Sequence, residues 1–112
     1  MKIAFTTKGT KWNSRMDPRF GRTKFFLIYD VEKHEFNHFD NRSIDNEAHG
    51  AGPKTAQKLF ELEANVLITG NGPGGNAATV LEKSGIKIYI GAGEMTVKEA
   101  FEAYQNRKLK EF

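Results

Sequence analysis

Short apolar runs alternate with amphipathic stretches along this chain of 112 residues. Residues 2–7 and 25–31 are apolar enough for buried strands, and the mixed run 34–40 follows the second after a short link typical of a hairpin. Residues 66–69 and 86–90 repeat the buried-strand pattern. The pattern therefore predicts five strands, with residues 34–40 at the periphery of the sheet.

Three amphipathic stretches predict helices. The first should begin within residues 50–53, where a proline suits the first helical turn. For the second helix, Asn76 is the predicted N-cap and Gly85 the predicted C-terminal breaker. Thr96 and Glu99 form a capping box that opens the third helix. Each helix has one apolar face that can pack on the sheet.

The order of these elements, βββαβαβα, predicts an α/β three-layer sandwich. A three-strand meander followed by right-handed crossovers gives a five-stranded mixed sheet of order 3-2-1-4-5, in which only strand 2 is antiparallel. This layout is ribonuclease H-like. Residues after Arg107 are predicted to be frayed or lightly packed. Ligands of such sheets bind at the carboxyl ends of the strands where the order reverses, here between strands 1 and 4.

The composition of the chain limits which classes of function we expect. With 38% hydrophobic and 28% charged residues, the chain suits one globular domain over residues 1–112. No apolar run approaches the roughly 18 residues of a membrane span, and the start lacks the apolar core of a signal peptide, so we expect a cytoplasmic protein with no membrane partner. The net charge of +3 is far from the dense basic stripe of a typical nucleic-acid binder. Nucleic acid is therefore not an expected partner.

The side chains offer no obvious catalytic group. The chain has no cysteine, which removes thiolate nucleophiles and thiolate metal ligands. The first and fourth predicted strands carry no carboxylate, which argues against two-metal nuclease chemistry. We find no Ser–His–acid arrangement or nucleophile elbow. A binding protein is expected rather than an enzyme.

Residues 70–75 match the pattern G-x-G-x-x-G between a predicted strand and a predicted helix. Backbone N–H groups there, with Gly70, Gly72 and Gly75 giving close approach, would cradle an anion at the helix N-terminus. The glycines would equally permit a sharp turn with positive φ. As a dinucleotide signature the motif is weak, because the next strand ends without the acidic residue that would hold a ribose.

Residues 17–22 place Arg19 and Arg22 around an aromatic residue just before the second strand. Two guanidinium groups would clamp a phosphate or carboxylate, although arginines on a loop are more often solvated. Phe20 is expected to anchor this loop on the core.

Three histidines complete the candidate set. His49 follows a loop with several carboxylates and precedes a helix, so it is a candidate metal ligand, or a helix-start histidine bonded to a backbone carbonyl. His34 and His38 are expected on one solvated face of the third strand.

Three motifs carry a family resemblance. They are DPRFGR at residues 17–22, HGAGP at residues 49–53 and GNGPGGNA at residues 70–77. Through them the chain resembles the nitrogenase iron–molybdenum cofactor-binding family, over about residues 1–105. The resemblance implies the ribonuclease H-like α/β fold. The family includes cofactor carriers and chaperones of nitrogenase maturation, so the resemblance implies an iron–molybdenum or iron–sulfur cluster as cargo and a cofactor-maturation protein as partner.

The family commonly has His-Phe-Gly-Arg at the segment that begins with Arg19 here. A guanidinium has no lone pair to give a metal, so Arg19 cannot replace a histidine ligand. The resemblance leaves His49 as the matching histidine, Arg19 and Arg22 as charge partners of an anionic cluster, and the glycine segment as a backbone donor surface.

The first hypothesis is a non-catalytic module that holds an anionic metallocluster or a related small anion. The alternatives are a regulatory domain that binds a nucleotide or phosphate, and a protein-interaction module that uses the edge strand or the last helix. The cluster hypothesis requires the segments of Phe20, His49 and Gly72 to meet around one hollow beside the first strand. The predicted cofactor-binding residues are Arg19, Phe20, Arg22, His49, Gly70, Gly72 and Gly75, with His49 as the metal ligand.

Overall fold

A computed structural model describes residues 1–45 and 51–112. Within these ranges, six strands form one mixed sheet of order β3-β2-β1-β4-β5-β6. The strands are β1 (Lys2–Thr7), β2 (Phe25–Asp30), β3 (Glu35–Asp40), β4 (Val66–Ile68), β5 (Lys87–Ile90) and β6 (Lys110–Glu111). The helices are α1 (Arg42–Asp45), α2 (Ala51–Glu61), α3 (Gly75–Lys83) and α4 (Val97–Gln105).

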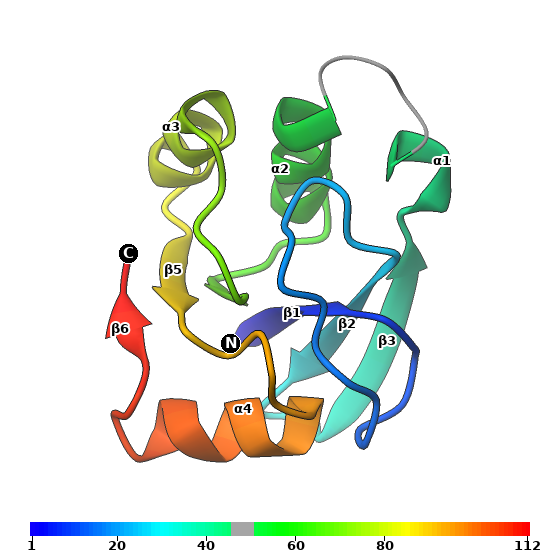
Figure 1. Cartoon of the computed structure of the whole chain (residues 1–112), viewed down its shortest axis with the longest axis vertical. Coiled ribbons are helices and arrows are strands. Elements are labelled where there is room, and N and C mark those ends of the chain that lie inside the picture. Colours follow the sequence, from blue (N-terminus) through cyan, green and yellow to red (C-terminus); the bar gives the residue numbers. More distant parts are fainter. Residues whose placement is uncertain (46–50) are drawn as a thin grey trace.

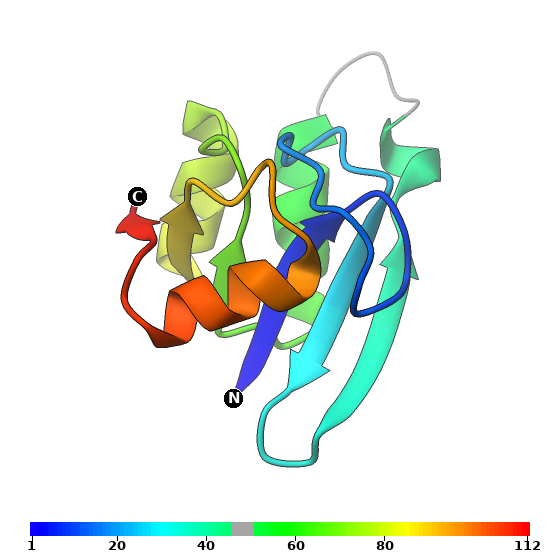
Figure 2. The ribbon, with the colours of Figure 1, turned by 60° about the horizontal axis from the view of Figure 1, so that its bottom comes forward.

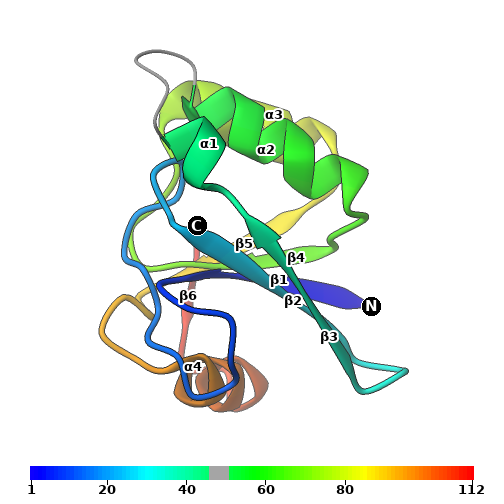
Figure 3. The same ribbon diagram turned by 90° about the vertical axis from the view of Figure 1, so that its right-hand side faces the viewer.

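The helices cover the sheet on both faces. Helices α2 and α3 lie side by side on one face, and α4 lies on the other (Figures 1 and 3). Strand β1 is central, and its side chains alternate between the two layers. Ala4 packs in the core beneath α2 and α3, whereas Ile3 and Phe5 pack with α4. Burial on both faces explains why β1 is apolar throughout its middle.

The predicted order of the first five strands is confirmed, and β2 is antiparallel to β1 as predicted. The prediction of only five strands is wrong, and the tail, predicted to be frayed or lightly packed, is paired through its backbone while its side chains stay exposed. Residues Lys110–Glu111 form β6, which pairs antiparallel with β5, so β2 is not alone in its direction. The N–H of Phe112 continues this pairing to the carbonyl oxygen of Ile88 at 2.9 Å. Backbone hydrogen bonds hold this charged, exposed tail, so no apolar period marks it in the sequence. The ribonuclease H-like classification stays a prediction.

The three predicted helices are present, and the structure adds the short helix α1, which the sequence pattern does not predict. The ends of the three follow the predictions with one exception. Thr96 and Glu99 form the predicted capping box at the start of α4, and Gly85 has a φ of +75° after α3. The N-cap of α3 is Gly74 rather than Asn76. The helix thus begins inside the glycine segment, because Gly74 has extended dihedrals that a cap requires. None of the described helices is long and apolar enough to cross a membrane.

Candidate functional site

The loops that follow β1 and β4 meet at the carboxyl ends of these parallel strands, on the left of Figure 3. We call residues 17–22 the arginine loop and residues 70–75 the glycine loop. The N–H of Asn71 donates to the carbonyl oxygen of Pro18 at 2.8 Å. A Cβ on Gly70 would lie 2.6 Å from the Cα of Pro18, so the two backbones are in direct contact. The sequence prediction that these loops converge is confirmed.

Asp17 holds the arginine loop in shape. Its side chain is fully buried, and its Oδ1 accepts the backbone N–H of Arg19 at 3.0 Å. The two carboxylate oxygens also accept Nε and Nη2 of Arg19, each at 3.1 Å. This two-point pair fixes the guanidinium plane. The Arg19 side chain remains 51% exposed, so its charge lies at the surface of the loop.

The remainder of the arginine loop joins the two helices above the sheet. Phe20 is 4% exposed and packs in the core shared with α2 and α3, 5.8 Å from the ring of Phe26. It therefore anchors the loop, as predicted. A Cβ on Gly21 would lie 3.0 Å from the backbone of Gly52, and a Cβ on Gly52 would lie 3.4 Å from Ala77. The arginine loop, the first turn of α2 and the first turn of α3 thus touch one another in series.

These two first turns carry the positive ends of two helix dipoles. Neither α2 nor α3 has an acidic residue in its first turn, and Gly74 gives α3 no side-chain cap. Helix α4 differs, because its capping box and the carbonyl oxygens of Ser14 and Trp12 accept the N–H groups at its N-terminus. Free N–H groups and the helix dipole both favour an anion. The exposed Lys54 in the first turn of α2 adds positive charge near the arginine loop.

The glycines of the glycine loop have separate roles. Gly70 packs against the arginine loop, and a Cβ on Gly72 would overlap the ring of Phe112. Around Gly74 and Gly75 a Cβ would meet nothing within 4 Å. Gly70 and Gly72 therefore serve packing, and the open N–H surface lies at the start of α3. None of these four glycines is required by a positive φ, since no residue of the glycine loop has a positive φ.

A hollow of about 540 Å³ lies on the other side of the arginine loop. It is lined by Pro18, Gly70, Asn71, Gly91, Gly93, Glu94 and Met95. Apart from Pro18 of the arginine loop, its walls belong to the turns after β4 and β5. The hollow therefore lies one strand further along the sheet than the crevice that the strand order predicts. Phe20 is buried and Phe112 covers Gly72, so neither of these two predicted residues lines this hollow.

Asn41 is a positioning residue that the sequence analysis missed. It is fully buried and donates through Nδ2 to the carbonyl oxygens of Gly21 at 3.2 Å and Thr23 at 3.0 Å. Its Oδ1 accepts the hydroxyl of Thr55 in α2 at 3.4 Å. Asn41 therefore ties the arginine loop to β3 and α2. In the sequence it begins a polar stretch and nothing separates it from its neighbours.

The predictions for the three histidines have three different outcomes. His49 and the Gly50 of its motif lie outside the described residues. His38 lies in β3 and is exposed, as predicted. His34 does not belong to the strand, because it has a φ of 53° in the hairpin turn and its Nδ1 lies 3.1 Å from the hydroxyl of Tyr29. Among the described residues, no three His, Asp or Glu side chains gather in a way that could hold a metal ion.

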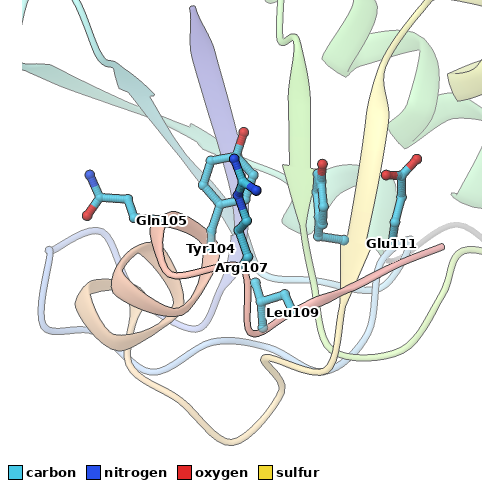
Figure 4. A pocket seen from close by; sticks show the side chains of 6 residues that line it. Tyr104, Gln105, Arg107, Leu109 and Glu111 are labelled. Carbon is cyan, nitrogen blue, oxygen red and sulfur yellow. The ribbon is translucent and has the colours of Figure 1, made fainter.

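A second pocket, of about 470 Å³, lies between α4, β5 and β6 (Figure 4). Tyr89 and Tyr104 form its aromatic wall at a ring separation of 5.1 Å, and Arg107 and Glu111 contribute opposite charges. Burial, and secondarily the charge of Tyr89, raises the pKa of Tyr104. The pocket joins neither the arginine loop nor the glycine loop, so it is a separate surface.

Known proteins resemble this chain over nearly its whole length. The chain is 30% identical to an uncharacterized protein of Methanocaldococcus jannaschii, over 100% of this chain and 92% of that protein. The apo orange protein of Desulfovibrio gigas has a similar structure, with a TM-score of 0.93 and 32% identity over 99% of this chain and 92% of that one. A putative NifB protein from Thermotoga, assigned to the DUF35 family, matches with a TM-score of 0.84 and 34% identity over 98% and 91% of the two chains.

A family profile described as dinitrogenase iron-molybdenum cofactor matches residues 1–107. These residues include the arginine loop, the glycine loop and all helices. The chain belongs to the dinitrogenase iron-molybdenum cofactor family.

Proposed function

We propose that this protein is a non-catalytic carrier that binds an anionic metallocluster, of the iron–molybdenum or iron–sulfur type, or a related small anion. The cluster is cargo that is held and released. Membership of a family named for the iron–molybdenum cofactor supports this class of cargo. A cofactor-maturation protein is the corresponding partner.

One observation carries the proposal. The N-termini of α2 and α3 adjoin through Gly52 and Ala77, and neither has an acidic residue in its first turn. The arginine loop closes this surface on a third side, through the contact of Gly21 with Gly52. Two helix dipoles and the N–H groups of the two first turns thus converge beside the arginine loop, where an anion is stabilised.

The donor set determines how a cluster would be held. The chain has no cysteine, and its described residues contain no group of three metal ligands. Charge and backbone N–H groups are therefore the main holding forces, with Arg19 and Arg22 as charge partners rather than ligands. His49 is the proposed metal ligand. Such binding is weaker than multi-thiolate ligation, which suits a protein that must pass its cargo on.

A nucleotide or phosphate is the second candidate, since Gly74 and Gly75 open a helix that follows a strand. The packing of Gly70 and Gly72 leaves less of the glycine loop open than a pyrophosphate cradle uses. A thermal-shift series separates the candidates. A ligand at 100 times its dissociation constant adds about 2.7 kcal/mol to the free energy of unfolding, so nucleotides without a shift at saturation exclude this alternative.

The direct experiment is an anaerobic titration of the protein with extracted iron–molybdenum cofactor and with a synthetic iron–sulfur cluster. The proposal expects charge-transfer absorption that saturates with added cluster. Arg22→Gln should weaken binding about tenfold, and His49→Ala should change the absorption spectrum, because it removes a ligand. Raised salt should weaken binding in the wild type, since charge contributes.

Arg107→Gln is the matched control, because it removes the same charge at the far end of α4. Its titration should equal that of the wild type. If the wild type gives no absorption change with either cluster, the carrier proposal fails. If Arg107→Gln weakens binding as much as Arg22→Gln, general charge accounts for the binding and the proposed location is wrong.

A further inference from the structure

The two edges of the sheet are unequal. Strand β6, at one edge, has two residues, whereas β3, at the other, has six and pairs with β2 along its full length. Figure 2 shows β3 at the outer edge of the sheet, beyond α4. Proteins usually blunt such an edge with proline, charged side chains or a bulge; β3 has neither proline nor a bulge, and its two carboxylates, Glu35 and Asp40, lie at its two ends. A long, regular, exposed edge is suited to pair with another strand.

The register of β3 shows which backbone groups are available. The N–H of Asn41 donates to the carbonyl oxygen of Lys24, which places odd-numbered residues of β3 in hydrogen-bonded pairs with β2. Because antiparallel ladders alternate, the N–H and C=O groups of Phe36, His38 and Asp40 point away from the sheet. An added strand must therefore pair with these even-numbered residues.

We infer that the partner is a second copy of this chain, which pairs its own β3 antiparallel to the first, with the two-fold axis at Asn37. Two hydrogen-bonded pairs then form, each between Phe36 of one copy and His38 of the other. Phe36 is 44% exposed and stacks on Tyr29, with ring centroids 4.5 Å apart, so the pairing covers an exposed aromatic ring. The two sheets become continuous.

Charge complementarity selects this partner and register. Centred on Asn37, the pairing places Glu35 opposite Phe39 of the other copy. Lys58 of α2 lies over the ring of Phe39, its Nζ 4.7 Å from the ring centroid and 3.9 Å from the carboxylate of Glu61 in the same helix, at the far limit of an ion pair. Directly opposed side chains have Cβ atoms about 5 Å apart, so the carboxylate of Glu35 reaches this ammonium group. Two such pairs form, one on each side of the axis.

The neighbouring registers lack this match. Centring the pairing on Phe36 places Lys33 opposite Phe39 and its Lys58, which brings like charges together. Centring it on His38 places the carboxylate of Asp40 against the ring of Phe36. A slip of one residue would bring opposite faces of the two sheets together. The nearest alternatives therefore move the two-fold axis by one residue, to Phe36 or to His38. The self-complementary one is the register centred on Asn37.

The test is sedimentation of the whole chain over a wide range of concentrations, with charge-reversal variants. The wild type should form dimers as concentration rises. Glu35→Lys and Lys58→Glu should each weaken association about tenfold, because each turns two attractive pairs into repulsive ones. The double variant E35K/K58E should restore dimers. Glu82→Lys, the same charge change on α3, should leave association unchanged.

Amide hydrogen exchange gives an independent reading that does not depend on variants folding. The N–H groups of Phe36 and His38 should become protected as concentration rises, whereas those of Asn37 and Phe39 should be protected at every concentration. A wild type that stays monomeric, with Phe36 and His38 exchanging freely throughout, overturns the inference and leaves this edge to a strand of another protein. Dimers that persist unchanged in both single variants overturn it too. Cluster binding at the arginine loop does not enter either readout.

Discussion

The backbone N–H of Asn71 donates to the carbonyl oxygen of Pro18 at 2.8 Å, which fastens the glycine loop to the arginine loop. The two residues are far apart in sequence, and their contact brings the segments after β1 and β4 into one rim. No side chain makes the bond, so its strength depends on how closely the two backbones approach. The neighbouring glycine sets that approach.

Gly70→Ala should therefore separate the loops. Its Cβ would lie 2.6 Å from the Cα of Pro18 and 2.8 Å from the Cα of Gly93, and both are backbone atoms that cannot rotate away. We expect a loss of about 1–3 kcal/mol in the free energy of unfolding, and weaker anion binding. Chemical denaturation measures the first and the cluster titration the second.

Gly74→Ala is the control within the same loop. A Cβ there meets nothing within 4 Å, and Gly74 has a φ of −64°, which alanine adopts freely. Its stability should stay within about 1 kcal/mol of the wild type, because the modest gain from a stiffer unfolded chain offsets the loss of a good N-cap residue. Equal losses at both positions would contradict the assignment of packing to Gly70 and an open surface to Gly74.

Asn41→Ala should loosen the arginine loop. The substitution removes the donor to the carbonyl oxygens of Gly21 and Thr23 and leaves both without this buried partner. The expected cost is about 1–3 kcal/mol in the free energy of unfolding. Asn13→Ala, at an exposed asparagine, should cost almost nothing. If Asn41→Ala unfolds like the wild type and like Asn13→Ala, Asn41 has no positioning role.

The capping box of α4 gives a prediction with a pH dependence. Thr96→Ala should cost about 1 kcal/mol, since it removes the acceptor for the N–H of Glu99. Hydrogen bonds from the backbone and side chain of Thr96 lower the pKa of Glu99. A carboxyl with a lowered folded pKa adds stability above its unfolded pKa, and this stability is lost as pH falls through the folded pKa.

The difference in free energy of unfolding between the wild type and Glu99→Gln should accordingly decrease as the solution is acidified below the ordinary glutamate pKa, because the wild type loses the contribution of the ionised carboxylate. Thermal unfolding across the acidic range measures this. A gap between wild type and variant that widens on acidification would contradict the sign.

The sequence predicts the fold where burial leaves a pattern. Strand β1 is buried on both faces, so its apolar run identifies it, and the crossover rule then orders the strands on either side. Strand β6 is not predicted because its two residues are charged and exposed, and only their backbone groups pair with β5. Asn76 looks like an N-cap by residue type, but the path of the glycine loop starts the helix earlier, at a glycine.

The site is less predictable because it consists of backbone contacts. The pattern G-x-G-x-x-G cannot distinguish Gly70, which meets Pro18, from Gly75, which meets nothing, since the difference lies in distant residues. The ring of Phe112 over Gly72 is likewise a contact between remote segments. The convergence of the loops was predictable from strand order, whereas the role of each glycine depends on contacts between segments that are remote in sequence.

The most direct test of the carrier account is a map of backbone amide resonances during titration with a small anion, molybdate or phosphate, and then with the cluster itself. The account predicts that the amides of Gly75, Asn76 and Gly52 shift or broaden first and saturate together, because they belong to the adjoining N-termini of α3 and α2. Saturable changes confined to the pocket of Tyr89 and Tyr104, with Gly75 and Gly52 unmoved, would contradict it.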